Sequence, residues 1–294
     1  MKKGLSWLLS AAIISGISIY INKFAVSSVS PVAFTFMKNA AVALIFLSII
    51  IGLGAFNRLR ELSKASWAKL ALVGVIGGGI PFILFFKGLA LTSAASASFI
   101  HKSLFIFVIA LSAIFLRQKP SPRIMLAGLA LLTGNWLLLK MGNVSFNFGD
   151  ILILLAALLW AGEFIISKRL LENIKPVELA FGRMFFGSII ILAYVFAFEG
   201  GIPLAAFSMS SLTWVAITGA FLFAYVATWY NGLARATPAI AAIVLMLGSP
   251  ITTLLSAFSG SPVTVLQWLG LGLIVAGVAV AVPRFSLLRT PDAL

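Results

Sequence analysis

The sequence predicts an all-α membrane protein of ten transmembrane helices, arranged as two inverted five-helix repeats. Three observations predict this fold class: a composition that is 62% hydrophobic and only 10% charged, a series of apolar segments, and a pattern that recurs along the chain. Soluble domains carry about 25% charged residues, so the composition excludes a soluble protein. A helix of about 20 apolar residues crosses the hydrocarbon core of a bilayer, and spanning segments of this length are expected to be helical.

The apolar segments follow one another through short connections that contain Ser, Pro and Gly. No connection is long enough to hold a soluble domain, so we expect the protein to act within the bilayer. The segments run over about 5–26, 31–52, 67–90, 93–116, 123–140, 148–168, 177–198, 212–234, 237–258 and 264–283.

The recurring pattern divides the chain into two halves, which we predict to be repeats over 1–142 and 143–294. Duplicated halves are a common architecture of secondary transporters, whose substrate site lies between them. At an offset of about 145 residues, Lys23, Pro31, Val32, Phe36 and Lys38 match Lys168, Pro176, Val177, Phe181 and Arg183, and Gly88-Leu89-Ala90 matches Gly232-Leu233-Ala234.

The basic residues of the connections predict the orientation. With the N-terminus in the cytoplasm, nearly all Lys and Arg of the connections fall on the cytoplasmic side, and only Lys23 and Lys140 fall outside. The positive-inside rule therefore predicts that both termini are cytoplasmic, in a plasma or inner membrane. Five spans per half make the second half enter from the opposite side, so the repeat is inverted. The net charge of +14 is dispersed between spans, and we expect no nucleic-acid partner.

Several motifs of the second half resemble an EamA domain, and the first half resembles it more loosely. The resemblance implies a member of the drug/metabolite transporter superfamily, whose members export amino acids and other metabolites. Two positions depart from the family pattern: Lys119 and Ser261 stand where acidic residues are common. The proline usual in the fourth span is absent from the first half, whereas Pro250 keeps it in the second. The motifs are Gly149-Asp150, Leu159-Trp160-Ala161, Ser167-Lys168-Arg169, Glu178-Leu179-Ala180-Phe181, Arg183, Asn231-Gly232-Leu233-Ala234, Ser249-Pro250 and Gln267-Trp268-Leu269-Gly270.

Two opposite charges are expected at similar membrane depth in the second half. Glu163 and Arg183 each lie about ten residues from the turn that joins the sixth and seventh spans. Charged groups in a bilayer are costly unless they are paired, so we predict a structural ion pair. In the first half Lys38 matches Arg183, but Ser18 replaces Glu163. Lys38 therefore either extends to the interface or faces the cavity as an anion-binding group.

His101 and Lys102 are the strongest candidates for substrate binding. They lie near the middle of the fourth span, about 13 Å along the helix, where a lysine does not easily reach the interface. We expect Lys102, which shares a helix face with Ser98 and Phe105, to face a cavity; the alternative is a lysine bonded to backbone carbonyls. His101 is the one histidine of the chain and the natural titrating group near neutral pH.

Aromatic residues of the eighth span are further candidates for the cavity. Tyr225 and Trp229 are four residues apart and share a helix face, and Asn231 follows them. Rings with a polar atom suit amphipathic substrates, although such residues also serve as packing. The matched third span carries Phe82, Phe85 and Phe86.

The third span also contains Gly77-Gly78-Gly79-Ile80-Pro81. Glycine and proline loosen a helix, because proline removes a backbone hydrogen bond. We predict either a hinge for alternating access, centred on Gly78 and Pro81, or a packed kink.

Together these features predict a secondary transporter, and more specifically an exporter, of small metabolites such as amino acids. No metal cluster, phosphate loop or catalytic constellation is present in the sequence, so we expect neither enzymatic activity nor a cofactor. The expected partners are a small-molecule substrate and the lipid bilayer, with the chain a monomer or homodimer. The alternatives are an antiporter of phosphorylated or other anionic metabolites, a membrane enzyme acting on lipid, and a non-transporting scaffold.

Overall fold

A computed structural model describes residues 2–22, 24, 30–139, 146–260 and 262–282, and all regular structure in these ranges is helical. Lys23, Lys140 and Ser261, about which we made predictions, lie outside the described residues. The elements are α1 (Lys2–Asn22), α2 (Pro31–Gly52), α3 (Phe56–Arg60), α4 (Lys64–Val73), the π-helix η1 (Gly74–Gly79), α5 (Ile80–Leu89), α6 (Ala94–Lys102), α7 (Leu104–Phe115), α8 (Pro122–Leu138), α9 (Phe148–Leu170), α10 (Pro176–Phe198), the 3₁₀-helix η2 (Leu204–Phe207), α11 (Met209–Ala234), α12 (Pro238–Leu245), α13 (Gly248–Phe258) and α14 (Val265–Ala281).

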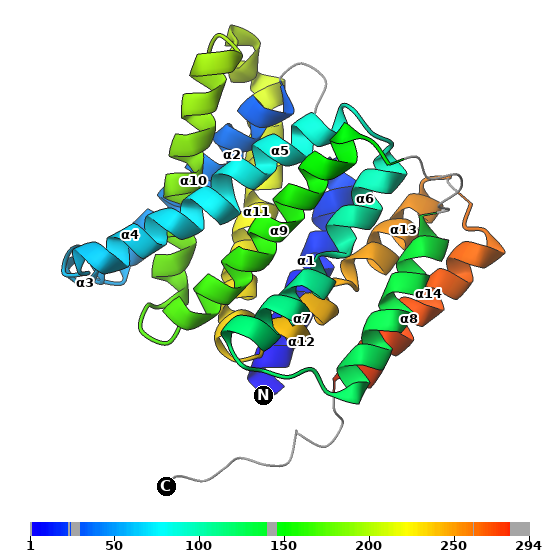
Figure 1. Cartoon of the computed structure of the whole chain (residues 1–294). Coiled ribbons are helices and arrows are strands. Elements are labelled where there is room, and N and C mark those ends of the chain that lie inside the picture. Colours follow the sequence, from blue (N-terminus) through cyan, green and yellow to red (C-terminus); the bar gives the residue numbers. More distant parts are fainter. Residues whose placement is uncertain (1, 23, 25–29, 140–145, 261, 283–294) are drawn as a thin grey trace, which may run out of the picture.

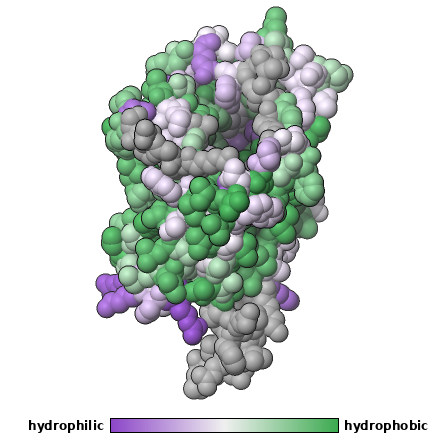
Figure 2. All heavy atoms as spheres, turned by 90° about the vertical axis from the view of Figure 1, so that its right-hand side faces the viewer, coloured by the Kyte–Doolittle hydropathy of each residue, from purple (hydrophilic) through white to green (hydrophobic). Residues whose placement is uncertain are grey.

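The predicted all-α membrane class is confirmed. Eight helical stretches are long and apolar enough to cross a membrane, and they lie at predicted spans with ends shifted by a few residues. The other two predicted spans, α8 and α14, are shorter apolar helices of 17 residues each. Leu44, Leu129, Phe196 and Trp268 are among many large apolar side chains exposed on the outside. In Figure 2 apolar residues cover the middle of the face shown, and hydrophilic residues gather towards its two ends.

Side-chain caps define where several helices begin. The first amides of a helix have no partner within it, and a hydroxyl before the first turn accepts from one of them. Three of these helices, α2, α8 and α12, also have a proline in the first turn, which disfavours helical backbone in the residue before it. The capping residues are Ser30, Ser93, Ser121, Ser208 and Thr237.

The helices of the two halves pack in corresponding pairs. α1 packs against α11 as α9 packs against α5, α2 packs against α10, and α8 packs against α14. Figure 1 shows α8 and α14 side by side, and α14 ends at the end of the molecule where α1 begins. Small residues allow close approach of these pairs: a Cβ on Gly134 would lie 2.8 Å from the Gly270 carbonyl oxygen.

The fourth and ninth predicted spans are each interrupted at their middle, between α6 and α7 and between α12 and α13. In the second interruption Pro250 has no amide hydrogen for the Met246 carbonyl, which accepts from Ser249 N at 3.1 Å instead. The first interruption has no proline. There the Ser103 hydroxyl donates to the Phe99 carbonyl at 2.8 Å, a back-bond that bends helices. The fourth span is therefore interrupted even though it lacks the proline of its counterpart.

The third predicted span is also irregular, because η1 separates α4 from α5. Its glycines permit backbone contact with α10: a Cβ on Gly78 would lie 2.5 Å from the Arg183 carbonyl oxygen, and one on Gly187 would lie 2.6 Å from the Gly78 carbonyl carbon. Gly78 and Pro81 are buried, so this irregular segment is packed against its neighbours. Movement of this segment as a hinge stays a prediction.

We predict that Gly78→Ala destabilises the protein, because the added methyl group has no space against α10. Overpacking of this kind costs about 1–3 kcal/mol of the free energy of unfolding. Gly162→Ala in α9 is the matched control, since a Cβ there meets nothing within 4 Å. Thermal unfolding of the purified proteins in detergent, followed by circular dichroism, measures both. Equal melting temperatures for the two variants would refute the backbone contact.

Candidate functional site

A cavity of about 260 Å³ lies between the two halves of the chain. Helices of both halves contribute to its wall: α1, α5, α6 and α7 from the first, and α9, α10, α11 and α12 from the second. Its aromatic lining residues are Phe82, Phe85, Phe86, Trp160, Phe164 and Tyr225; the polar ones are Ser15, Ser18, His101, Lys102 and Arg183; the aliphatic ones are Ile19, Leu104, Leu222 and Leu245.

Both interrupted spans meet at this cavity. His101 and Lys102 end α6, Leu104 begins α7, and Leu245 ends α12. Irregular backbone at membrane depth is tolerated where it is buried in protein or lines a cavity, and broken helices form the substrate sites of many transporters. The site therefore lies where the middles of two broken helices face each other.

Lys102 supplies a cation without a protein partner. Within the described ranges its ammonium group has no hydrogen bond, ion pair or ring contact. The C-terminal end of α6 favours a positive charge, because the helix dipole is negative there. Lys102 thus lies at the cavity wall, with its donors free for a ligand.

His101 belongs to the aromatic part of the wall. Its ring centroid lies 5.3 Å from that of Phe85 and 5.0 Å from that of Trp160. Trp160 also packs edge to face on Phe82, with ring centroids 5.3 Å apart. These rings form a continuous apolar surface beside Lys102.

The carbonyl groups of η1 bind side chains from three other helices. Arg183 Nη2 and Trp160 Nε1 donate to the Gly77 carbonyl at 3.1 and 3.0 Å. Asn39 Nδ2 donates to the Gly78 carbonyl at 3.2 Å. These bonds orient two cavity-lining side chains of the second half by the backbone of the first.

Glu163 and Arg183 are neighbours, but they do not form the direct ion pair that we predicted. Glu163 Oε1 accepts from the Tyr230 hydroxyl at 2.7 Å and from the Ser167 hydroxyl at 2.5 Å. Gly77 lies against both side chains: a Cβ there would be 2.5 Å from Glu163 Cγ and 3.3 Å from Arg183 Nε. The two charges therefore balance each other across Gly77. Because Gly77 belongs to the first half, the sequence of the second half gave no indication that it separates them.

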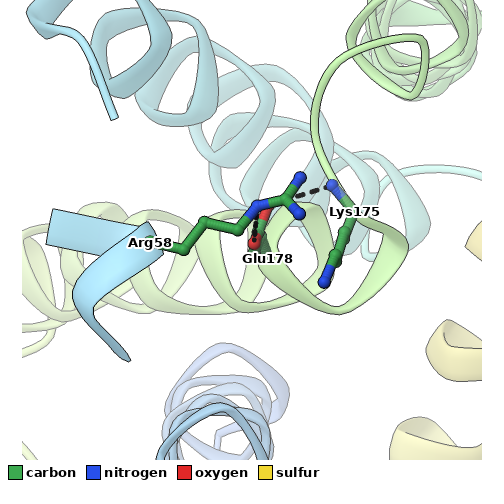
Figure 3. Close-up of polar contacts among 3 residues, drawn as sticks. All are labelled: Arg58, Lys175 and Glu178. Carbon is green, nitrogen blue, oxygen red and sulfur yellow. Dashed lines mark hydrogen bonds and ion pairs between the residues drawn. The ribbon is translucent and has the colours of Figure 1, made fainter. Parts of the chain in front are cut away.

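The salt bridge found in the described residues lies in a connection. Arg58 Nε is 3.1 Å from Glu178 Oε1, while the Lys175 amide donates to Glu178 Oε2 at 2.9 Å (Figure 3). Glu178 is fully buried, so this contact fixes α3 on the start of α10.

Lys38 lies behind the cavity wall rather than in it. Its ammonium donates to Asn22 Oδ1 at 2.9 Å, and Asn22 Nδ2 donates to the Ser18 hydroxyl at 3.1 Å. Ser18 lines the cavity, so two hydrogen bonds connect Lys38 with it. The ammonium also lies 5.0 Å from the centroid of the Phe34 ring.

The structure separates the three candidates of the eighth predicted span. Tyr225 lines the cavity. Trp229 is fully buried behind it, with its ring centroid 4.5 Å from that of Phe164. Asn231 lies near the end of α11, where its side chain binds Ala227 O at 2.9 Å and Arg235 Nη1 at 3.1 Å. Asn231 is therefore not brought to the site.

Sequence reasoning did not single out Trp160 and Phe164 for the site. Trp160 lies one turn before Phe164 on the same face of α9, and this spacing was the available signal. The hydrogen bond from Trp160 to η1 joins positions 83 residues apart in the sequence, which no local pattern indicates.

We predict that the double exchange Glu163→Arg with Arg183→Glu prevents folding, because each side chain has its own partners besides the opposite charge. A glutamate at 183 cannot donate to the Gly77 carbonyl, and the loss of a buried charged partner costs about 3–5 kcal/mol. The control is Arg60→Glu with Glu61→Arg, an exchange of exposed neighbours. Monodisperse elution of both exchanged proteins after detergent extraction would contradict the prediction.

Comparison with known proteins identifies the family. The model of the EamA-like transporter family matches residues 2–140 and 147–282. The chain is 25% identical over 297 residues to the uncharacterized transporter YyaM of Bacillus subtilis (strain 168), covering 95% of each chain. It is also 25% identical over 292 residues to an uncharacterized transporter of Archaeoglobus fulgidus, covering 97% of this chain and 100% of that one.

A solved crystal structure has the same fold. It superimposes with a TM-score of 0.79 over 96% of both chains, at 18% sequence identity. Three findings agree with one another. The family model matches both halves of the chain, the helices are apolar, and the transporter relatives align over nearly their full length. This chain is an integral, multi-pass membrane protein and belongs to the EamA-like transporter family.

Proposed function

We propose that this protein is a secondary transporter that exports small zwitterionic or anionic metabolites, amino acids among them, by alternating access. The observation that carries the proposal is the unpaired Lys102 ammonium in a cavity where two interrupted helices meet. A cation without a partner inside a membrane-spanning segment is costly to keep. A ligand with a carboxylate compensates that cost whenever it occupies the site.

The proposed architecture consists of two inverted repeats, divided near residue 142. It is supported by two helix contacts: α1 packs on α11, and α9 packs on α5. Because α9 corresponds to α1 and α11 corresponds to α5, each contact is the counterpart of the other in the opposite half. Both spans that are interrupted at their middle occupy the fourth position of their half. We further propose that the end where α1 begins faces the cytoplasm, because Arg58, Arg169 and Arg235 lie in or beside the connections at that end.

Alternating access requires one end of the cavity to close, and contacts at the end of α9 support such a closure. Lys168 Nζ donates to the carbonyls of Leu233 and Ala234, both at 3.0 Å, at the end of α11. The neighbouring Arg169 donates to the Phe115 carbonyl at the end of α7. These contacts join a helix of the first half to two of the second. The direction of transport, export, follows from the family resemblance alone.

The rival antiporter of phosphorylated metabolites needs several unbalanced cations in one place. Of the other basic residues of the spans, Arg183 lies beside Glu163, Lys38 lies behind the wall, and Lys87, in the last turn of α5, packs 4.9 Å from the centroid of the Tyr194 ring. Lys102 alone is left for the substrate, which favours a singly charged carboxylate. A scaffold would have no use for this unpaired cation. No residue arrangement on the described surface supports an enzymatic alternative.

We expect Lys102→Met to abolish substrate transport without loss of folding, because methionine keeps the side-chain length and removes the charge. Lys87→Met is the matched control: Lys87 is exposed, lies outside the cavity, and should be replaceable with full activity. Counterflow of labelled amino acids and organic anions into proteoliposomes measures transport, and elution from a sizing column checks folding. Full counterflow in Lys102→Met would show that Lys102 serves packing only.

A further inference from the structure

We infer that the cavity selects organic anions that combine one carboxylate with one aromatic or similarly bulky apolar group, and that it binds such an acid more tightly than the corresponding amino acid. The inference rests on the proposed transport function and names the substrate class of the same site. It follows from the charge, the apolar lining and the size of the cavity.

The charge of the lining is positive and contains no counter-charge for an ammonium group. Lys102 and Arg183 are the charged lining residues, and among the described residues no carboxylate lines the cavity. Glu163 is the nearest acid, but it is fully buried, and Tyr230 and Ser167 occupy its Oε1. Because Glu163 balances Arg183 across Gly77, the site presents one net positive charge, that of Lys102.

An amino acid would bring its α-ammonium into this environment. Aromatic rings attract cations, but such contacts contribute about 0.5–2 kcal/mol. Desolvation of an uncompensated charge costs several kcal/mol, and Lys102 in the same cavity adds repulsion. The ammonium therefore weakens binding, whereas a carboxylate without it gains the full attraction of Lys102.

The apolar part of the lining fits one ring system. Phe82, Phe85 and Trp160 form a wall with the His101 ring, and Leu222 and Leu245 also line the cavity. An engineered protein cavity of about 150 Å³ binds benzene. The 260 Å³ available here therefore hold one aromatic ring with a short carboxylate chain.

The remaining polar groups are neutral. Ser15 and Ser18 lie three residues apart on one face of α1, and both line the cavity. Ser18 already accepts a hydrogen bond from Asn22, so its own hydroxyl hydrogen is available for a donor role. A hydroxyl donor suits an oxo or hydroxyl substituent of the acid and offers no charge for an ammonium.

Binding of four matched compounds to the purified full-length protein in detergent tests the inference. The compounds are 3-phenylpropanoate, phenylalanine, 2-phenylethylamine and propanoate, which differ in the carboxylate, the ammonium or the ring. Quenching of tryptophan fluorescence reports binding, because Trp160 lines the cavity, and Trp160→Phe identifies its share of the signal. We expect 3-phenylpropanoate to bind at least about tenfold more tightly than phenylalanine, a difference of roughly 1.4 kcal/mol, and the other two compounds more weakly still.

The Lys102→Met variant should remove the preference for 3-phenylpropanoate, and Lys87→Met should leave it unchanged. Equal or tighter binding of phenylalanine, preferential binding of 2-phenylethylamine, or binding of none of the four overturns the inference.

Counterflow into proteoliposomes, with protein-free liposomes as the control for passive permeation, separates this inference from the proposed function. Transport of phenylalanine without a preference for 3-phenylpropanoate would leave the transporter standing and refute the selectivity. Tight binding of 3-phenylpropanoate without counterflow of any compound would support the site and refute transport by it.

Discussion

The carbonyl group of Gly77 is the contact on which the site depends. It accepts from Arg183 and Trp160, so one backbone oxygen of the first half orients a cation and an aromatic ring of the second. Glu163 packs on the same glycine, which places its charge near Arg183 without a direct ion pair. In the core of a bilayer no water satisfies buried polar groups, so these bonds within the protein hold the two side chains in place, although Glu163 Oε2 and Arg183 Nε have no hydrogen-bond partner. A side chain at position 77 would separate them.

The two halves contribute differently to the charge of the cavity. The second half supplies Arg183 together with the acid that balances it, whereas the first half places Ser18 where the second has Glu163. When the two halves are aligned, Lys102 corresponds to Met246. The interruption of one half is therefore charged, and that of the other is apolar. We propose that the single positive charge left among aromatic side chains by these mismatches selects the ligands of the transporter.

Much of the fold could be predicted from the sequence, because apolar length and the distribution of Lys and Arg reflect the bilayer directly. The helical class and the places of the spans followed from it. The partners of Glu163 and Arg183 could not be predicted, since Gly77 and Tyr230 reach them from other helices. Lys38 and Asn231 have suitable chemistry, but a hydrogen bond to Asn22 of α1 holds Lys38 behind the wall, and one from Arg235 holds Asn231 at the end of α11. The π-helix lies in the glycine run that indicated an irregular third span. The interruption at Ser103 was not predicted, because it has no proline, and the Ser103 hydroxyl donates to the Phe99 carbonyl there.

The sign of the charge inside the cavity can be measured directly, because the chain contains no cysteine and a single one can be introduced. Leu245→Cys places a thiol at the interruption of the second half, across the halves from Lys102. A methanethiosulfonate reagent that carries a sulfonate should modify this thiol faster than one that carries a trimethylammonium group, and Lys102→Met should remove the difference. Faster modification by the trimethylammonium reagent would contradict a positively charged site between the two halves.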